Sequence, residues 1–454
     1  MIRLAIVEEI AKKLTADLLP GDLLEHGAFC LVRVGQGKHG KRLLVSEMIL
    51  PPSNAWEDQG SDMLRPSAKW ISAAISQASQ AQSGLLFIHS HPNPLHPLGL
   101  SIVDQSSFRS LAETIAPMLD GPFTAAVIHP EGWDGVIWDD DRIVPIDRIV
   151  SVGRTLRFLS PLPKTAFSSL DDRQRDALGL VHDRVCIITA GIVGVGGLGS
   201  PIAEQLVRMG VEEVILIDHD LLDTESNVRC VFGSRVSDLR HAEKRAKVDV
   251  VSDHLDKIGL GTHIRTIKGD VRTETVFRHL LDADVVFSGT DTHGSRAILN
   301  ELASTYLLPV IDVGVRVGAK ANKHLSGLLA EVRVLTPTTP CLWCRGTIDA
   351  DVIRAENLPP KERERLEREG YVVGGVGSPV PSVVALTVLG SGLATSALLA
   401  LLSEEGEVAP SGYWVDGFLG DSRVSGPDQP KPACRCRQQL GLGDAAPLPF
   451  MVPA

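Results

Sequence analysis

The chain has 454 residues, a formal net charge of −11, and 22% charged and 44% hydrophobic residues. A single core rarely grows beyond roughly 250–300 residues, so this length predicts two or three domains, and the composition leaves no room for long disordered segments. The acidic balance, without a long basic run, argues against a nucleic-acid partner. The first residues, MIRLAIVEEIAKKL, lack the apolar core and cleavage site of a signal peptide, which predicts a cytoplasmic protein.

Residues 1–158 are expected to form one α/β domain. Apolar runs of strand length recur through it, namely FCLVRV, LLVSEMIL, GLLFIHS, TAAVIHP and GVIW. Between them, residues 67–80 and 106–115 have the spacing of amphipathic helices. Residues 159–170, which begin LSPLPKTAFSS, are rich in Pro and Ser and form the predicted linker.

Two histidines and an aspartate in this domain have the spacing of a metal site. His89 and His91 end the run GLLFIHS, and alternate residues of a strand face the same side. Asp104 would complete three zinc ligands and leave a fourth position open for water, as catalytic zinc sites do. Glu47, in the run LLVSEMIL, would accept a proton from that water, and Ser101 would stabilise an oxyanion.

This set of residues resembles the JAMM (MPN-plus) metalloprotease motif. Nine residues, 92–100, separate the second histidine from the serine, where the family usually has seven. The resemblance implies an α/β domain that cleaves peptide or isopeptide bonds at the C-terminus of a ubiquitin-like protein. The alternative is that the histidines are ordinary strand residues.

Residues 171–454 alternate strand and helix signals. Strands are expected in VCIITAGIVGVGG, VEEVILIDHD, HIRTIKGD and ADVVFSGTDT, with helices at 200–209 and 244–258. This order predicts a doubly wound, Rossmann-like domain with a mostly parallel sheet. The apolar segment 382–402 is long enough to span a membrane, but its small residues favour a helix buried in a soluble domain, so no membrane contact is expected.

A glycine loop opens this second domain. Gly194, Gly196, Gly197 and Gly199 follow an apolar strand and precede a helix, where backbone N–H groups and the helix dipole hold phosphates. Asp218, about twenty residues further on, would bind a ribose. Taken alone, the loop fits NAD or FAD as well as ATP.

Charged residues beyond the loop favour ATP. Asp291 ends another expected strand, at the edge where such sheets bind ligands, and its carboxylate could hold Mg²⁺ between phosphates. Cations next to the loop suit a triphosphate better than a hydride-transfer site. The candidates near the phosphates are Asp220, Asn227, Arg229, Lys247 and Arg173, with Lys244 as a competitor of Lys247.

The segments DRQRDALG, GVGGLGS, LIDHD with the following Asn and Arg, TDTHGSR and PCLWC together resemble the ThiF/MoeB superfamily of ubiquitin-activating enzymes. The resemblance implies an adenylyltransferase in which the glycine loop and Asp218 bind ATP. By the same resemblance, Asn227, Arg229 and Lys247 contact the phosphates and Asp291 binds Mg²⁺. Arg173 would reach into the partner's site in a homodimer.

Four cysteines form two close pairs. Cys341 and Cys344 flank two residues, and Cys434 and Cys436 flank one, which predicts a structural zinc site of four thiolates; unpaired core cysteines are the alternative. Many relatives have a thioester-forming cysteine beyond the first pair, but this chain has none between residues 344 and 434. Of Cys30, Cys186 and Cys230, only Cys230 is expected near the ATP pocket. Either the chain stops at an acyl-adenylate, or a cysteine of the zinc pairs is reactive.

The sequence therefore predicts a bifunctional enzyme of a bacterial ubiquitin-like conjugation system. One domain would adenylate the C-terminus of a ubiquitin-like protein, and the other would cleave at that C-terminus. A conjugating-enzyme-like protein is a candidate partner. Two alternatives remain: activation of a sulfur carrier for cofactor or cysteine biosynthesis, and a non-catalytic scaffold. The sequence names neither the modifier nor its acceptor.

Overall fold

We describe the protein from a computed structural model at residues 1–163, 170–240, 243–319, 324–370, 383–404 and 410–453. The chain divides into two compact units. The first comprises residues 1–164, 305–307 and 439–447, and the second comprises 165–304, 308–438 and 448–454. The boundary at residue 164 falls inside the predicted linker.

The first unit is built on a mixed nine-stranded sheet with the order β11-β10-β1-β3-β2-β6-β7-β8-β9. Strand β1 runs parallel to β10 and β3, and β6 runs parallel to β7, whereas the other neighbours are antiparallel. Its strands are β1 (Ile2–Val7), β2 (Gly27–Gln36), β3 (Lys41–Ile49), β6 (Gly84–Ser90), β7 (Phe123–His129), β8 (Gly132–Asp139), β9 (Arg142–Pro145), β10 (Arg148–Val152) and β11 (Leu156–Phe158). A separate hairpin pairs β4 (Trp56–Gln59) with β5 (Leu64–Pro66).

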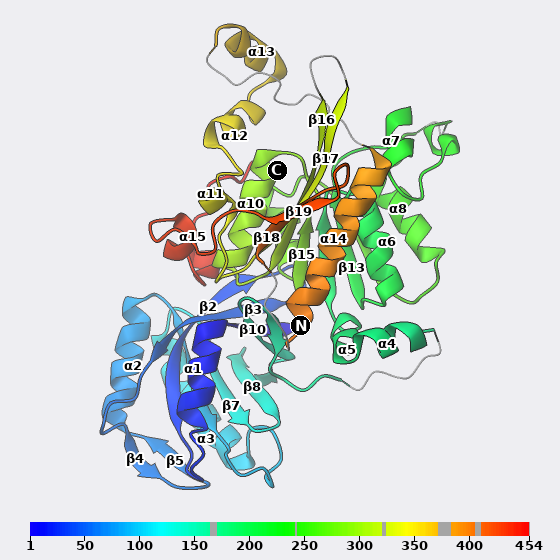
Figure 1. The fold of residues 1–454 in the computed structure, drawn as a ribbon. Coiled ribbons are helices and arrows are strands. Elements are labelled where there is room, and N and C mark those ends of the chain that lie inside the picture. The colour runs from blue at the N-terminus through cyan, green and yellow to red at the C-terminus, as the bar shows by residue number, and fades with distance from the viewer. Residues whose placement is uncertain (164–169, 241–242, 320–323, 371–382, 405–409, 454) are drawn as a thin grey trace. The chain divides into compact units, whose positions relative to one another are not determined.

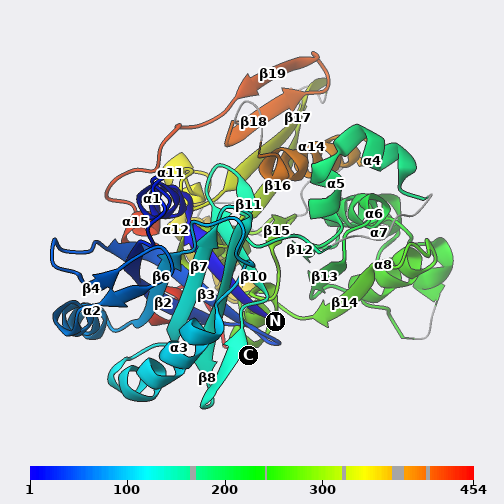
Figure 2. The ribbon, with the colours of Figure 1, turned by 90° about the horizontal axis from the view of Figure 1, so that it is seen from below.

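Helices cover both faces of this sheet, as Figures 1 and 2 show. Helix α1 (Glu8–Leu18) buries Ala11, Leu14 and Leu18 against one face. Helices α2 (Ala68–Gln80) and α3 (Ile102–Ile115) pack on the other face with a short 3-10 turn, Ala116–Met118, after α3. Strands with apolar side chains on both faces are expected when helices cover both, because each face is then removed from water.

The second unit contains an eight-stranded sheet with the order β14-β13-β12-β15-β16-β17-β18-β19. The first five strands are parallel, which confirms the predicted mostly parallel sheet, and β17 to β19 extend it in antiparallel fashion. The strands are β12 (Thr189–Val193), β13 (Glu213–Asp218), β14 (His263–Lys268), β15 (Val285–Ser288), β16 (Val310–Ala319), β17 (Leu325–Leu335), β18 (Gly412–Asp416) and β19 (Asp421–Val424).

The helices of this unit alternate with its strands along the chain and flank the sheet (Figure 1). They are α4 (Asp172–Leu178), α5 (Leu180–Val185), α6 (Gly199–Met209), α7 (Glu225–Cys230), α8 (Lys247–Asp256), α9 (Glu274–Leu280), α10 (His293–Thr305), α11 (Leu342–Arg345), α12 (Ala350–Glu356), α13 (Pro360–Arg368), α14 (Val384–Leu402) and α15 (Arg435–Gln438). A short 3-10 turn occurs in this unit at Val236–Arg240, and another, at Gly443–Ala445, belongs to the first unit.

Helix α14 is the apolar segment noted in the sequence. It has the length and mean hydropathy of a membrane span, and half of it is buried inside the protein. It packs against α6, β16 and β17. Ser391 Oγ donates to Leu198 O over 3.0 Å, and Thr395 Oγ1 donates to Gln205 Oε1 over 2.7 Å, so its polar side chains bond to neighbouring elements.

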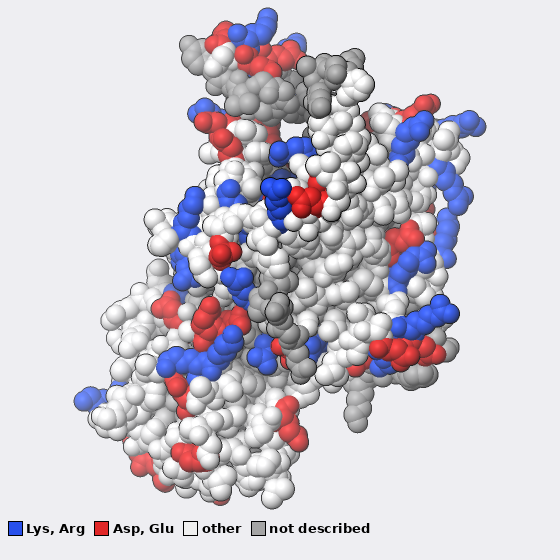
Figure 3. All heavy atoms as spheres, viewed as in Figure 1, with Lys and Arg blue, Asp and Glu red and all other residues white. Residues whose placement is uncertain are grey.

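Basic and acidic side chains are interspersed on the face drawn in Figure 3. They do not gather there into one continuous basic area of the kind that binds a nucleic-acid backbone.

Candidate functional sites

The order of the parallel strands creates a ligand site in the second unit. From β12 the chain moves outward through β13 to β14, and it then returns to the other side of β12 with β15 and β16. Ligands bind at such a switch point, beyond the carboxyl ends of the strands. A cavity of about 780 Å³ opens here, lined by residues of the loops after β12, β13 and β15.

The glycine loop forms one wall of this cavity. Gly194, Gly196 and Gly197 line it, and Gly194 has a φ of 84°, a conformation that favours glycine. Gly199 begins α6, where a Cβ atom would lie 1.9 Å from Gly194 O, so no larger residue fits without moving the loop. The loop thus brings backbone N–H groups and the N-terminus of an eleven-residue helix to the cavity.

Acidic and basic residues after β13 form the next wall. Asp218 is buried and accepts hydrogen bonds from Val195 N at 2.7 Å and Asp220 N at 2.8 Å, which ties the end of β13 to the glycine loop. Lys247, the first residue of α8, donates to Asp220 Oδ2 at 2.6 Å. Asp218, Asp220 and Lys247 all line the cavity, whereas Lys244 does not and lies 4.0 Å from Asp223.

Three predicted phosphate contacts lie elsewhere. Asn227 donates to Asp223 Oδ1 at 3.1 Å, and the Arg229 side chain is exposed on α7. Arg173 is exposed on α4. None of the three is among the residues that line the cavity. Asn227 and Arg229 were located by counting from β13, but the direction of a short helix such as α7 depends on packing that counting does not include. The role of Arg173 was expected in the site of a partner subunit, and it stays a prediction.

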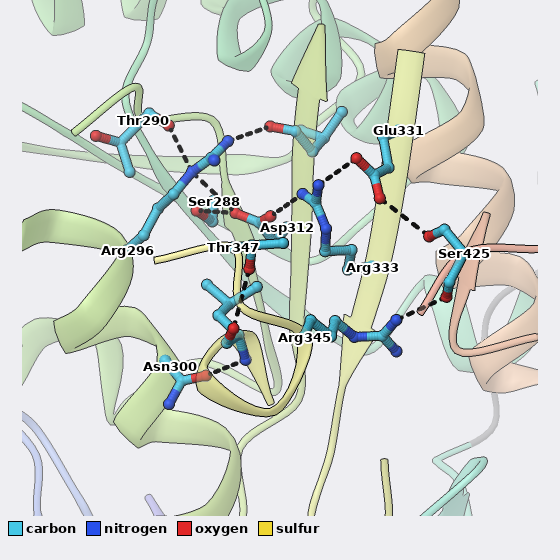
Figure 4. A network of polar contacts seen from close by, with 12 residues as sticks. Ser288, Thr290, Arg296, Asn300, Asp312, Glu331, Arg333, Arg345, Thr347 and Ser425 are labelled. Atoms are coloured by element: carbon cyan, nitrogen blue, oxygen red, sulfur yellow. Dashed lines mark hydrogen bonds and ion pairs between the residues drawn. The ribbon is translucent and has the colours of Figure 1, made fainter. Parts of the chain in front are cut away.

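Asp291 lines the cavity from the loop between β15 and α10. Behind that loop, β16 and β17 contribute a buried ion network that the sequence analysis missed (Figure 4). Asp312, which is fully buried, accepts from Ser288 Oγ at 2.9 Å and from Arg333 at 2.8 Å, and it lies 3.3 Å from Arg296 Nε. Arg296 lies in the same segment, TDTHGSR, as Asp291, and this position in the sequence could have indicated that it lies near the site.

The four paired cysteines come together in the second unit. The Sγ–Sγ distances are 3.6 Å from Cys341 to Cys344, 3.6 Å from Cys341 to Cys434, and 3.8 Å from Cys344 to Cys436. Four thiolates at about 2.3 Å from a tetrahedral zinc lie about 3.8 Å apart, so the donor set fits zinc. Hydrogen bonding from Cys436 and its neighbours lowers the pKa of Cys341 to about 5. The cluster is therefore consistent with a structural zinc site.

The remaining cysteines are poor candidates for a thioester. Cys30 is fully buried in the first unit, and burial raises the pKa of its thiol to about 12. Burial also raises the pKa of Cys186. Cys230 ends α7 and is not among the residues that line the cavity, so the predicted proximity to the nucleotide pocket is not borne out.

We expect Cys341→Ser to remove one zinc ion per chain and to lower the unfolding temperature, because a closed site contributes its binding energy to folding. Metal analysis of the full chain should give two zinc ions for the wild type and one for Cys341→Ser. His91→Ala, which removes one of the candidate zinc ligands of the first unit, should also leave one zinc ion per chain. A Cys341→Ser protein that retains both ions would contradict a zinc site at these thiols.

The three predicted ligands of the first unit also come together. The Nε2 atoms of His89 and His91 are 3.2 Å apart, and they lie 3.4 Å and 3.3 Å from the two carboxylate oxygens of Asp104. Tetrahedral ligands at about 2.0–2.1 Å from zinc are about 3.3–3.4 Å apart, so this donor set fits zinc as well. Both imidazoles are buried.

Local structure holds these ligands in place. His89 pairs with Gly27 on one side and with Val127 on the other, so its strand β6 is central in the sheet. Ser101 is the N-cap of α3: its Oγ accepts from Asp104 N, and an Asp104 oxygen accepts from Ser101 N. This reciprocal cap fixes the Asp104 carboxylate, and hydrogen bonds from both histidines outweigh burial and lower its pKa.

Glu47 does not join this cluster. It lies on β3, opposite Leu31 of β2, and β2 separates β3 from the histidine-bearing β6. Its side chain is 57% exposed and lies 3.4 Å from Arg33. The prediction that Glu47 lies beside the metal ligands is wrong, because the sequence does not specify which strands pair with β6.

A different glutamate, Glu25, lies beside the histidines, where Glu47 was expected. It precedes β2, is buried, and has a carboxylate oxygen 3.8 Å from His91 Nε2. Its backbone N–H donates to Gly60 O at 2.8 Å, which fixes the turn before β2. Burial raises the pKa of Glu25, against the opposing effect of the two histidines. A buried carboxyl group with a raised pKa beside candidate metal ligands is typical of a general base or acid.

Proteins similar to part of this chain were found. The ubiquitin-like modifier-activating enzyme 5 of Drosophila melanogaster is 26% identical over 301 residues, which cover 63% of this chain and 67% of that protein. The adenylyltransferase and sulfurtransferase UBA4 of Meyerozyma guilliermondii is 30% identical over 120 residues, which cover 26% of this chain and only 27% of that protein. The solved structure of E. coli MccB with MccA-N7isoASN aligns with a TM-score of 0.47 and 16% identity, over 60% of this chain and 75% of that one.

A sequence profile described as the ThiF family matches residues 183–436. That range covers more than half of the chain, and it contains the glycine loop, the cavity and all four clustered cysteines. The chain therefore belongs to the ThiF family.

Proposed function

We propose that the second unit uses ATP to adenylate the C-terminal carboxylate of a ubiquitin-like protein. The observation that carries this proposal is the single cavity that the glycine loop, Asp218, Lys247 and Asp291 line together. The relatives named above are a modifier-activating enzyme and an adenylyltransferase, and we extend that chemistry to this chain.

The residues suit this reaction as follows. Backbone N–H groups of the glycine loop and the dipole of α6 would bind phosphate oxygens. The Lys247 ammonium group would leave Asp220 and bind a phosphate oxygen instead. Asp291 would hold Mg²⁺, which supplies charge neutralisation on the phosphates when bound. The substrate carboxylate oxygen would attack the α-phosphorus of ATP and pyrophosphate would leave. Catalysis would then come mainly from positioning and from charge stabilisation.

ATP–pyrophosphate exchange tests this proposal. We expect the full chain to exchange labelled pyrophosphate into ATP only when Mg²⁺ and a ubiquitin-like protein with a free terminal carboxylate are both present. The same protein extended past its terminal glycine should support no exchange with the His91→Ala chain, which lacks one of the proposed zinc ligands and should not remove the extension, since the terminal glycine carboxylate is then absent. Exchange that persists under these conditions would contradict the proposed acceptor group.

A second function is favoured by the cluster in the first unit. We propose that His89, His91 and Asp104 hold a catalytic zinc and that Glu25 acts as general base in the cleavage of a bond at a ubiquitin-like C-terminus. A zinc ion held by these three side chains would lower the pKa of a bound water toward neutral pH. Glu25 would accept its proton, and the Ser101 hydroxyl, whose oxygen already accepts from Asp104 N, can still donate its own proton to an oxyanion.

Sulfur-carrier activation remains the alternative use of the same adenylation chemistry. One of the relatives is named as a sulfurtransferase as well as an adenylyltransferase. The two uses differ in the nucleophile that consumes the adenylate. In sulfur-carrier activation it is sulfide or a persulfide, and in modifier conjugation it is a thiol or an amine. Supplying each acceptor to the preformed adenylate would distinguish them.

A further inference from the structure

Helix α12 follows the first cysteine pair in the chain, and its last residue, Glu356, bonds to the start of α10, two residues after Asp291. The Glu356 carboxylate accepts hydrogen bonds from His293 N and Gly294 N, each at 2.8 Å. These are the first two N–H groups of α10, which an isolated helix would leave without partners. A negative charge at this position is also favourable to the helix dipole.

Glu356 and Arg272 lie close to the backbone at Gly294. A Cβ atom at Gly294 would lie 3.2 Å from a Glu356 oxygen and 3.3 Å from Arg272 Cδ. Thr292 and Ser295 bond to each other at 2.8 Å through their hydroxyl groups, which adds a local cap to the same turn. The start of α10 is therefore fixed from two sides, directly after Asp291.

The remainder of the α12 segment makes further contacts beside the cavity. Asp349, the N-cap of α12, donates its N–H to His293 Nδ1 at 3.0 Å. Asn357, just past the helix, accepts from Arg272 at 2.8 Å, and Arg272 in turn binds Asp270 through two nitrogens at 3.0 Å and 2.7 Å. Asp270 lines the cavity together with Asp291.

Helix α10 is also bonded to the cysteine cluster. The N–H of Leu342, which follows Cys341, donates to the buried Asn300 Oδ1 of α10 at 2.8 Å (Figure 4). The two residues that bond α10, Leu342 at Asn300 and Glu356 at the first turn, belong to one stretch of chain that begins inside the first cysteine pair. This stretch thus holds α10 at its N-terminus and again two turns further on.

We propose that Glu356 is a positioning residue for adenylation, which fixes the start of α10 and with it the loop that presents Asp291 to the magnesium–nucleotide complex. This inference rests on the proposed adenylation activity. Glu356 contacts backbone groups and not the cavity, so it acts through Asp291.

The test measures ATP binding to the full chain by calorimetry, with excess Mg²⁺ and again with EDTA. We expect Glu356→Ala to weaken ATP binding about five- to tenfold in Mg²⁺, the size expected for a lost helix cap, and to leave binding in EDTA unchanged. Glu356→Gln retains one acceptor oxygen and should give a smaller loss. Glu362→Ala removes an exposed carboxylate from the neighbouring α13 and should match the wild type.

A double-mutant cycle separates a positioning role from a general loss of structure. If Glu356 acts through Asp291, Glu356→Ala should add no further loss to Asp291→Ala, because coupled residues are not additive. Fully additive losses, or an equal loss in EDTA, would overturn the inference. If Glu356→Ala does not fold, the same comparison is made with Glu356→Gln. A wild-type chain that binds no ATP would instead overturn the proposed adenylation itself.

Discussion

Asp291→Ala should lower ATP–pyrophosphate exchange by about 100-fold or more. Asp291 lines the cavity and is the carboxylate we assign to Mg²⁺, and removal of a group that stabilises transferring phosphates typically costs a factor of about 10²–10³ in rate. The measurement is the exchange rate at saturating ATP, with a ubiquitin-like protein that supports exchange by the wild-type chain.

The matched control for this variant is Asp256→Ala. Asp256 is an exposed carboxylate at the end of α8, outside the cavity, and its removal changes the net charge by the same amount. Its exchange rate should equal that of the wild type. If Asp291→Ala exchanges at the wild-type rate, the magnesium assignment fails.

Glu25→Gln should abolish cleavage of a ubiquitin-like protein extended past its terminal glycine, with a loss of at least about 100-fold, because a general base contributes about 10²–10⁴ in rate. The amide keeps the size of the side chain but cannot accept the proton. Zinc content should stay at the wild-type value, since the ligand atoms belong to His89, His91 and Asp104. Cleavage is measured by mass spectrometry of the released extension.

Glu47→Gln is the control that separates the two glutamates. Glu47 is exposed and pairs with Arg33, and strand β2 separates its strand from the histidine-bearing β6. The Glu47→Gln variant should therefore cleave at the wild-type rate. The reverse outcome, with full activity in Glu25→Gln and none in Glu47→Gln, would restore the assignment made from the sequence. A wild-type chain with no zinc at His91 would remove the proposed peptidase activity altogether.

Features that depend on short stretches of sequence were predicted well. The glycine loop appears where the strand, the glycines and the following helix were expected, because the backbone at Gly194 and the close approach at Gly199 require glycine locally. The four cysteines come together across ninety residues, as the chemistry of zinc ligation implies. The parallel part of the second sheet follows from the alternation of strands with helices.

Features that depend on strand register were not predicted. Glu25 lies beside His91 because Gly27 pairs with His89, and a register of this kind is set by long-range packing. The antiparallel strands β17 to β19, which contribute Arg333 to the cavity wall, were not recognised either. Helix α14 packs against β17, whereas most residues of β19 are exposed, so the three strands share no single apolar pattern.

The first strand and helix of the chain were also missed. Strand β1 (Ile2–Val7) pairs with β3 and β10 in the centre of the first sheet, and α1 follows it directly. From the sequence, these residues were interpreted only as a candidate targeting segment. An apolar run followed by an acidic first turn, Glu8 and Glu9, was the signal for a strand that leads into a helix.

Nucleotide binding by the full chain tests the central claim most directly. Calorimetric titration of the purified protein with ATP in excess Mg²⁺, and separately with NAD⁺, compares the two ligands that a glycine loop at this switch point could hold. We predict that ATP binds at one site per chain and that NAD⁺ neither binds nor competes. Binding of NAD⁺ in place of ATP, or no binding of ATP at all, would contradict the account.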